Sequence, residues 1–377
     1  MKHRGLQIVC TPMLVVALMT LTFLVGPASG SASASPVEVL YLAQPQASKA
    51  SLATYDVNPV TGVAVKVGAT ITVPSSSVAP VSIGTNHVIY VWNGTEVWTY
   101  VTNSEGVPNK LPSQHLNFGF GYTVNTFLAN PNGKFAYAAQ TWFDSRFNAN
   151  AEIVLFTIDQ STGKLSNTNK VVARYGPDGI TTLGPFTFGK RGSKLYAVFD
   201  VFGAHVCSVG YDYYPVNQTN GQLGSLIGSV GYDCESAGGV AVSDETTASA
   251  QACCGVGITR VATGQSISCG PAMQTFCGDW AFWLSLDPGG QNLFFADRNT
   301  SQISIGHMDW TNSTVVLSPS TIPGAPPLYF SPDSKLVYAV NATDIAIYAL
   351  QSSSGKLTAS TSLPRSGNVS VATATLH

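Results

Sequence analysis

The pattern of apolar and polar residues repeats along the chain with a period of roughly 40 to 57 residues, and one recurrent unit is a short apolar segment that contains an aromatic residue. Apolar residues at consecutive positions are typical of strands that are buried on both faces. The segments are Val39-Leu40-Tyr41-Leu42, Val88-Ile89-Tyr90-Val91, Phe135-Ala136-Tyr137-Ala138, Leu195-Tyr196-Ala197-Val198, Leu293-Phe294-Phe295-Ala296 and Leu336-Val337-Tyr338-Ala339. A repeat of this length indicates an array of small sheets that bury their faces against one another.

Residues typical of turns lie before and after these segments. Before three of them stands a turn in which Pro fixes φ at the second position and Asn, Asp or Gly tolerates the positions that follow, so each marks a hairpin. These turns are Asn130–Lys134, Asp287–Gln291 and Ser331–Lys335. An alternating strand that leads into a second polar turn follows the segments, and we interpret it as an outer hairpin. The clearest cases are Leu52–Gly62, Val154–Leu165, Val209–Leu223 and Ala346–Leu357.

Together the two units predict an all-β fold, namely a single seven-bladed β-propeller with four-stranded blades. Six blades are clear in the pattern, and Gly238–Pro271 has the length and position of a seventh. The pattern opens on a second strand at Glu38–Gln44 and finishes on an orphan strand at Val369–Leu376. We therefore predict that the last strand completes blade one and closes the ring, which leaves only short protected edges.

The first residues have the profile of a signal peptide. Positive charge at Lys2 and Arg4 precedes an almost wholly apolar run, Ile8–Gly26, and small residues then offer a cleavage site after Ala34. The alternative is an uncleaved anchor, because the apolar run approaches the roughly 20 residues that span a bilayer. We predict a signal peptide at residues 1–34, a propeller at residues 35–377, a secreted or periplasmic protein, and no membrane span after cleavage.

Composition narrows the range of partners. Charged residues make up 10% of the chain, and the formal net charge is −2. No basic patch appears along the sequence, which disfavours nucleic-acid binding. We expect a monomer without a cofactor. Its partner would be a small molecule, a carbohydrate or another protein.

Six cysteines lie beyond the signal peptide, and an even number in an exported chain suggests three disulfides. They are Cys207, Cys234, Cys253, Cys254, Cys269 and Cys277. A zinc site is disfavoured because the adjacent pair Cys253-Cys254 lacks the two-residue spacer of zinc knuckles. Because the midpoint between Cys207 and Cys234 falls between Asn220 and Gly221, where the chain should reverse, we predict that they form a cross-strand disulfide. The three pairings of the other four cysteines remain open.

The stretch Ser331–Tyr338, with the Ile-x-Ile-Tyr-x-Leu and Ser-Ser-Gly-Lys-Leu-Thr motifs after it, resembles the lactonase-like seven-bladed propellers. That family includes enzymes of the 6-phosphogluconolactonase and carboxymuconate cyclase types, and the resemblance implies their fold over nearly the whole mature chain. Its enzymatic members often carry a His-x-His pair on an inner strand. Thr123 and Asn125 stand at those places here, and neither can act as a base near neutral pH. The resemblance therefore specifies the fold better than the chemistry.

The loops that follow the second strands offer the best material for a binding pocket, because they gather at one mouth of a propeller. They supply Trp92, Trp142, Asp144, Arg146, Asp200, His205, Asp297 and Arg298, a mixture of rings and charges suited to a sugar or another polar ligand. The alternative for Asp200 and Asp297 is that they only cap turns. No catalytic residue can be named, and no Gly-x-Ser-x-Gly motif is present.

These observations favour a non-catalytic binding module for carbohydrate, cell-envelope or protein ligands. The second hypothesis is a lactonase or cyclase with a diverged, relocated site. The third is a surface protein whose repeats supply only stability.

Overall fold

The structure, a computed structural model, describes residues 37–75, 81–84, 87–119, 121–145, 149–175, 180–189, 192–202, 207–233, 237–243, 246–251, 255–260, 263–267, 281–297, 302–324, 327–365, 367 and 369–376. Within these ranges the chain forms β-strands and turns without an α-helix, so the all-β prediction is confirmed. The same ranges accordingly contain no helix long and apolar enough to cross a membrane. The predicted signal peptide lies outside them.

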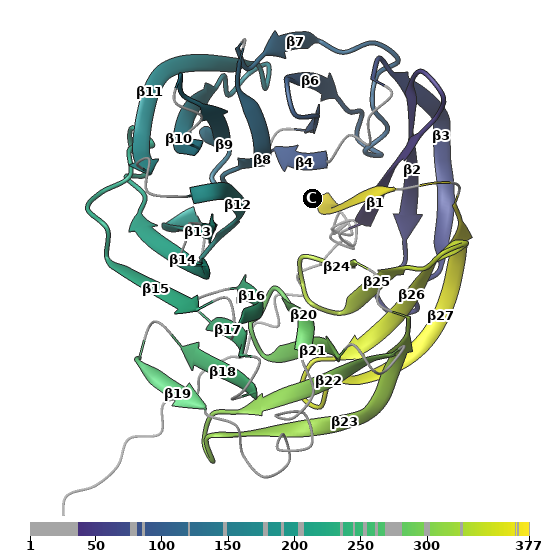
Figure 1. The fold of residues 1–377 in the computed structure, drawn as a ribbon. Helices are drawn as coiled ribbons and strands as arrows, with labels where there is room; N and C mark the ends of the chain where they lie inside the picture. The colour runs from purple at the N-terminus through teal and green to yellow at the C-terminus, as the bar shows by residue number, and fades with distance from the viewer. Residues whose placement is uncertain are drawn as a thin grey trace, which may run out of the picture. The chain divides into compact units, whose positions relative to one another are not determined.

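The strands of the described ranges form seven antiparallel sheets of four strands each, numbered here in chain order (Figure 1). Sheet one contains β28 (Ser370–Leu376), β1 (Val37–Pro45), β2 (Ala50–Val57) and β3 (Ala64–Val73). Sheet two contains β4 (Val81–Gly84), β5 (Val88–Trp92), β6 (Glu96–Val101) and β7 (Gln114–Asn117). Sheet three contains β8 (Thr123–Ala129), β9 (Phe135–Phe143), β10 (Ala149–Ile158) and β11 (Leu165–Tyr175). Sheet four contains β12 (Ile180–Phe188), β13 (Lys194–Phe202), β14 (Cys207–Pro215) and β15 (Gly228–Asp233).

The remaining three sheets repeat the same order. Sheet five contains β16 (Ala237–Ser243), β17 (Thr246–Gln251), β18 (Gly255–Arg260) and β19 (Gln265–Ile267). It lies in the stretch Gly238–Pro271, for which a further blade was predicted from length and position. Sheet six contains β20 (Ala281–Leu286), β21 (Asn292–Asp297), β22 (Gln302–Asp309) and β23 (Thr314–Pro323). Sheet seven contains β24 (Leu328–Phe330), β25 (Leu336–Val340), β26 (Asp344–Gln351) and β27 (Lys356–Pro364). The prediction of a propeller built from four-stranded blades is confirmed.

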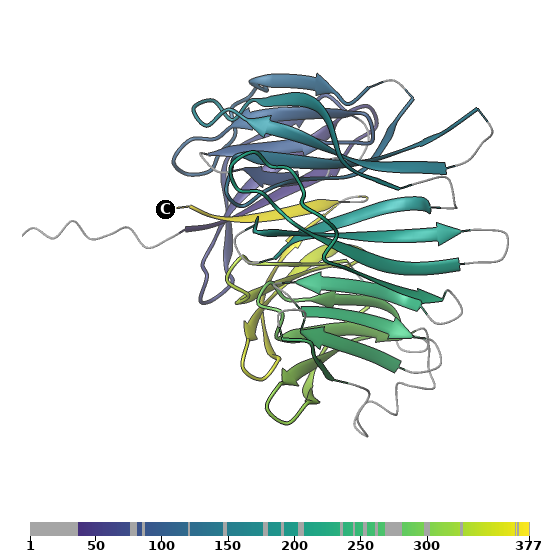
Figure 2. The same ribbon diagram turned by 90° about the vertical axis from the view of Figure 1, so that its left-hand side faces the viewer.

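Neighbouring sheets pack against each other in chain order. The innermost strands β28, β4, β8, β12, β16 and β20 contact one another in that sequence, while sheets six and seven meet through β23 and β27. Figure 2 shows the sheets stacked beside each other from the side. β24 of sheet seven also contacts β28 of sheet one. β28 pairs with β1 from Ala43 opposite Ser370 to Val37 opposite Leu376, which is the predicted pairing of the first and last strands.

A recurring tyrosine ties each of the first three sheets to the next. The second-strand residues Tyr41, Tyr90 and Tyr137 are fully buried, and each hydroxyl donates to the carbonyl oxygen of a glycine in the outer turn of the following sheet. For Tyr90 the acceptor is Gly163, at 2.8 Å. Gly163 has a φ of +69°, and a Cβ there would stand 2.2 Å from a methyl group of Val88. Only glycine therefore allows this close approach.

The hairpin expected between Cys207 and Cys234 is present, because β14 and β15 pair as far as Ser208 opposite Asp233. Cys207 is the first residue of β14. Cys234, Cys253, Cys254, Cys269 and Cys277 lie outside the described residues. The three disulfides therefore stay predictions.

Candidate functional site

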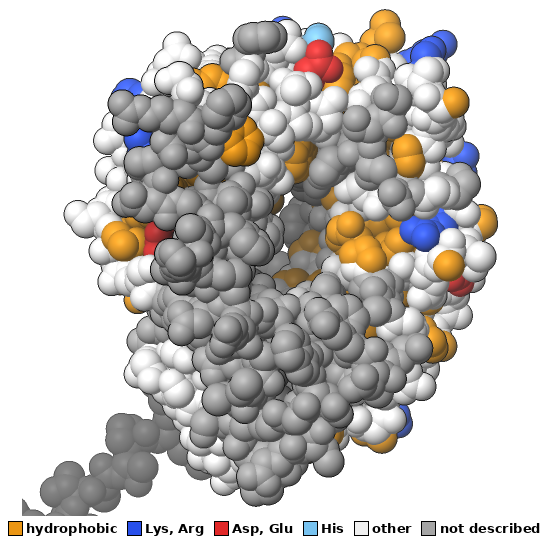
Figure 3. All heavy atoms as spheres, viewed as in Figure 1, with side chains coloured by type: hydrophobic (Ala, Val, Ile, Leu, Met, Phe, Trp, Pro, Cys, Tyr) orange, Lys and Arg blue, Asp and Glu red, His pale blue; other side chains and the backbone are white. Residues whose placement is uncertain are grey.

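The innermost strands carry no charge. None of the sequences of β28, β4, β8, β12, β16, β20 and β24 contains Asp, Glu, Lys, Arg or His. On the face seen in Figure 3, the described charged side chains lie away from the central hollow. Acid–base groups for any reaction in this channel would therefore have to come from the loops rather than from its wall.

Two aromatic rings and three small polar side chains meet where the β8–β9 ladder ends. We call this group the Trp142 cluster; it consists of Tyr122, Thr123, Asn125, Thr141 and Trp142. The rings of Tyr122 and Trp142 meet edge to face, with their centroids 5.5 Å apart. The amide of Asn125 donates to Oγ1 of Thr141 at 3.3 Å, and Thr123 is exposed beside them. Aromatic faces combined with hydroxyl and amide groups suit a neutral polyhydroxy ligand.

Asn125 occupies a special backbone position, because it is the extra residue of a β-bulge. Val124 pairs with Gln140 and Thr126 with Ala139, which leaves Asn125 without an opposite residue. Bulges of this kind re-aim a side chain and are frequent beside active sites. The bulge thus gives the Trp142 cluster a geometry that a regular ladder would not.

The same irregularity recurs in four consecutive sheets. Near the start of the innermost strand, the ladders of sheets four, five and six also skip one residue, at Thr181, Gly238 and Phe282. The β28–β1 ladder of sheet one, by contrast, runs through seven pairs without a shift. The described ladders therefore distinguish sheets three to six from sheet one, and we call these four consecutive sheets the bulged arc.

The structure places the predicted ligand-binding residues at the ends of second strands. Trp142 lies in β9 and is half-buried, and Asp144 directly follows that strand. Asp200 of β13 pairs with Thr182, and Asp297, the last residue of β21, pairs with Ala281. Asp200 and Asp297 thus each belong to a residue pair of the ladder that lies next to a bulge. Arg146, His205 and Arg298 lie outside the described residues.

Trp92 has a different environment. It ends β5, is only 7% exposed, and packs against Phe127 with ring centroids 6.5 Å apart. Its neighbours form the apolar core between sheets two and three. Its ring therefore contributes to packing, and we leave it out of the site.

Glu152 and Glu38 are among the buried carboxylates of the described residues that the sequence analysis did not single out. Glu152 of β10 accepts a hydrogen bond from Gln140 at 2.7 Å and forms an ion pair with Arg174 at 3.3 Å. Glu38 of β1 is 3% exposed and accepts a 2.5 Å hydrogen bond from the hydroxyl of Tyr338, across the contact between sheets one and seven. Burial raises the pKa of Glu38 to about 7. The sequence signal for such a buried carboxylate was a single acidic residue within a mainly apolar strand.

None of the described histidines belongs to an innermost strand, and His87 lies in the turn between β4 and β5. His115 of β7, an outermost strand, stacks on Trp98 with an interplanar angle of 4° and is 3.3 Å from Glu96. His307 of β22 is within hydrogen-bond distance of Asn292. The described part of the chain contains no group of three or more His, Cys, Asp or Glu residues that could hold a metal ion.

Comparison with known proteins gives a likeness in fold. No family model matches the chain, and no curated protein matches its sequence. A periplasmic gluconolactonase from Pseudomonas aeruginosa aligns with a TM-score of 0.62 at 14% identity, over 90% of this chain and 100% of the other. A candidate 6-phosphogluconolactonase from Bacteroides fragilis aligns with a TM-score of 0.60 at 15% identity, over 91% and 99%. A similar protein from Bacteroides uniformis gives 0.55 at 16%, over 89% and 99%. The chain therefore has the fold of the lactonase-type β-propellers.

Proposed function

We propose that this protein is an extracytoplasmic, lactonase-type propeller whose seven sheets form one closed ring and that it binds and opens an uncharged sugar lactone over the bulged arc. The fold carries the proposal, because it matches nearly the full length of two proteins described as lactonases of sugar acids. One of them is described as periplasmic, in keeping with the predicted signal peptide.

The preference for an uncharged ligand follows from the wall of the channel. Binding a phosphate group takes Lys or Arg side chains or a cradle of backbone amides. The seven innermost strands supply no cationic side chain, whereas Thr123, Asn125 and Thr141 present hydroxyl and amide groups. Of the two ligand types named for the neighbours, the gluconolactone type therefore fits this wall better than the 6-phosphogluconolactone type.

Lactone hydrolysis adds water to the ring carbonyl, breaks the bond between that carbon and the ring oxygen, and leaves a hydroxy carboxylate and a proton. The water needs a base, and the developing oxyanion needs a hydrogen-bond donor or a cation. We assign the base to Asp144, Asp200 or Asp297 and the cation to Arg146 or Arg298. The Trp142 cluster would orient the sugar.

A second candidate is a binding module that does not turn its ligand over. The observation that favours it is the pair Thr123 and Asn125, which replaces the histidines expected on the inner strand and leaves that strand without a base. The two candidates share a site and differ only in the reaction.

Proton release from glucono-δ-lactone, corrected for spontaneous hydrolysis, tests the first candidate. We expect turnover above background, much less with the 6-phosphorylated lactone, and a loss of at least tenfold in one of the variants Asp144→Asn, Asp200→Asn and Asp297→Asn. Asp159→Asn, in an exposed outer turn, is the matched control. A thermal shift with the non-hydrolysable gluconolactam but no turnover would select the binding module. Neither turnover nor a shift would reject both candidates.

A further inference from the structure

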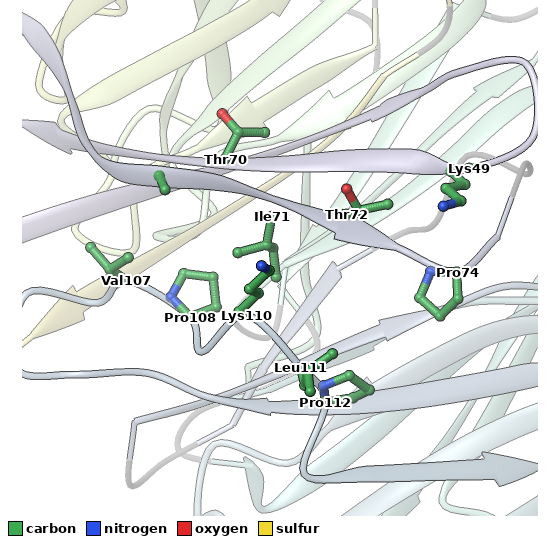
Figure 4. A pocket seen from close by; sticks show the side chains of 11 residues that line it. Lys49, Thr70, Ile71, Thr72, Pro74, Val107, Pro108, Lys110, Leu111 and Pro112 are labelled. Atoms are coloured by element: carbon green, nitrogen blue, oxygen red, sulfur yellow. The ribbon is translucent and has the colours of Figure 1, made fainter.

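A groove of about 660 Å³ lies at the outer edge of the propeller, away from the channel (Figure 4). One wall is Ala69–Thr72 of β3, and the other is the segment Val107–Pro112 between β6 and β7. In Figure 4, Ile71 points from β3 toward the segment that carries Lys110. A volume of this size is within the range of specific binding pockets.

The first wall is an open strand edge. β3 is the outermost strand of sheet one and pairs only with β2, so its other edge has unpaired backbone groups. Four consecutive residues of β3, Ala69 to Thr72, line the groove, and neighbouring residues of a strand lie on opposite faces. The groove therefore follows the strand rather than one face of it.

The second wall is held in place by hydrogen bonds. The side-chain oxygen of Asn103 accepts from the amides of Glu105 and Val107, and the amide of Asn109 donates to the carbonyl of Val101. Tyr41 of sheet one donates to the carbonyl of Gly106 at 2.8 Å. A wall fixed in this way loses little conformational entropy when a ligand binds.

The charge of the groove has one sign. Lys49 and Lys110 are both exposed and line it, and no acidic residue does. Neither lysine forms an ion pair among the described residues. The floor between them is apolar, with Ile71 and Pro108 buried and Leu111 73% exposed. Two unpaired cations over an apolar floor complement a ligand that alternates acidic and apolar groups.

From these features we infer that the groove binds an extended acidic segment of a partner protein, which pairs with the open edge of β3 as an added strand. The backbone of that segment would pair with β3, an apolar side chain would cover Leu111, and its carboxylates would meet Lys49 and Lys110. The groove is separate from the bulged arc, so the inference does not depend on the proposed reaction.

An anionic polysaccharide would also meet the two lysines, yet the other features of the groove favour a peptide. Sugar rings pack on aromatic faces, and no aromatic residue lines the groove. An unpaired strand edge and an apolar floor are instead the features of strand addition, in which alternate side chains enter the site.

The test uses a fluorescein-labelled peptide of alternating Asp and Val residues, with fluorescence anisotropy as the measurement. We expect saturable binding to the full protein that weakens at high salt. The double variant Lys49→Glu/Lys110→Glu should weaken it at least tenfold. The matched control Lys164→Glu/Lys356→Glu makes the same change of charge at exposed lysines of other outer hairpins and should leave binding unchanged.

Two further probes separate the peptide from its rivals. The same peptide with N-methyl groups on alternate residues cannot pair along a strand edge and should bind at least tenfold more weakly. Equal binding of the methylated and unmethylated peptides would overturn the inference, because charge alone would then explain the attraction. Binding of oligogalacturonate in place of the peptide, or of neither, would overturn it as well.

Discussion

Replacing Glu38 by Gln should change the way in which the stability of the protein depends on pH. Glu38 lies where the first and last sheets meet, 3% exposed, with its carboxylate bound to the hydroxyl of Tyr338. Burial raises the pKa of Glu38 to about 7, the repulsion from Asp333 adds to this rise, and the Tyr338 hydrogen bond and Lys335 oppose it. The folded protein therefore favours the protonated acid.

The sign of the effect follows from proton linkage. The unfolded chain has an ordinary glutamate pKa of 4.5, so between pH 4.5 and pH 7 the folded state holds a proton that the unfolded state has lost. Stability from this group is complete below pH 4.5, falls as the pH rises, and is gone above pH 7. The difference between the two pKa values corresponds to about 3 kcal/mol in the free energy of unfolding.

Glutamine keeps the shape of the protonated acid and can still accept the Tyr338 hydrogen bond, but it does not titrate. The Glu38→Gln variant should therefore be about as stable as the wild type near pH 4. Near pH 8, where the wild type must bury a charge, the variant should be more stable by up to about 3 kcal/mol.

Urea unfolding followed by tryptophan fluorescence, at steps between pH 4 and pH 8, measures this difference. Glu105→Gln is the matched control, because Glu105 is exposed in a turn, and its difference from the wild type should stay within about 0.5 kcal/mol throughout. A difference between Glu38→Gln and the wild type that does not vary with pH would falsify the argument, since Glu38 would then not titrate in this range.

Three more predictions concern the ring. Deleting the last ten residues removes β28, which pairs with β1 over seven positions, and should sharply lower the melting temperature; an unchanged value would contradict the role of this pairing. Gly163→Ala should lower the free energy of unfolding by about 2 to 4 kcal/mol, because a positive φ is combined with a 2.2 Å clash. Gly264→Ala, where φ is +66° and nothing lies within 4 Å, should lower it by about 1 kcal/mol in the same urea experiment. Equal costs would show that the clash relaxes. Mass spectrometry of an unreduced digest should find Cys207 joined to Cys234, and Cys207 bound to any other cysteine would mean that the disulfide was misassigned.

The architecture could be predicted from the sequence because it depends on local signals. The second strands are apolar at consecutive positions, as at Val88–Val91, since both faces of each sheet are covered. The turns are specified by their own side chains: the side-chain oxygen of Asn130, for example, accepts a hydrogen bond from the backbone amide of Asn132. The C-terminal pairing was also accessible, because an orphan strand at one end matched a missing strand at the other.

The site could be predicted only in part, because its features depend on register and burial. Trp92 and Trp142 look alike in sequence, each at the end of a second strand, yet one is 7% exposed in a core and the other is half-buried beside Tyr122. Glu38 acquires its raised pKa from burial at the contact between sheets one and seven, beside Tyr338, which is 300 positions away in the sequence. Neither distinction follows from local composition, since both depend on which sheets become neighbours.

The repetition of the fold itself suggests where function lies. In a ring of similar sheets, features that every sheet needs, such as apolar second strands, are explained by packing and carry little information about a ligand. A feature confined to some sheets has no such explanation. The bulges of sheets three to six are of this kind, because the uninterrupted β28–β1 ladder shows that a propeller sheet packs without one. Bulges weaken pairing locally, so four of them at corresponding ends of consecutive sheets imply a compensating role. Binding along that arc, where Asn125, Asp200 and Asp297 lie, is the role that the proposed function gives them.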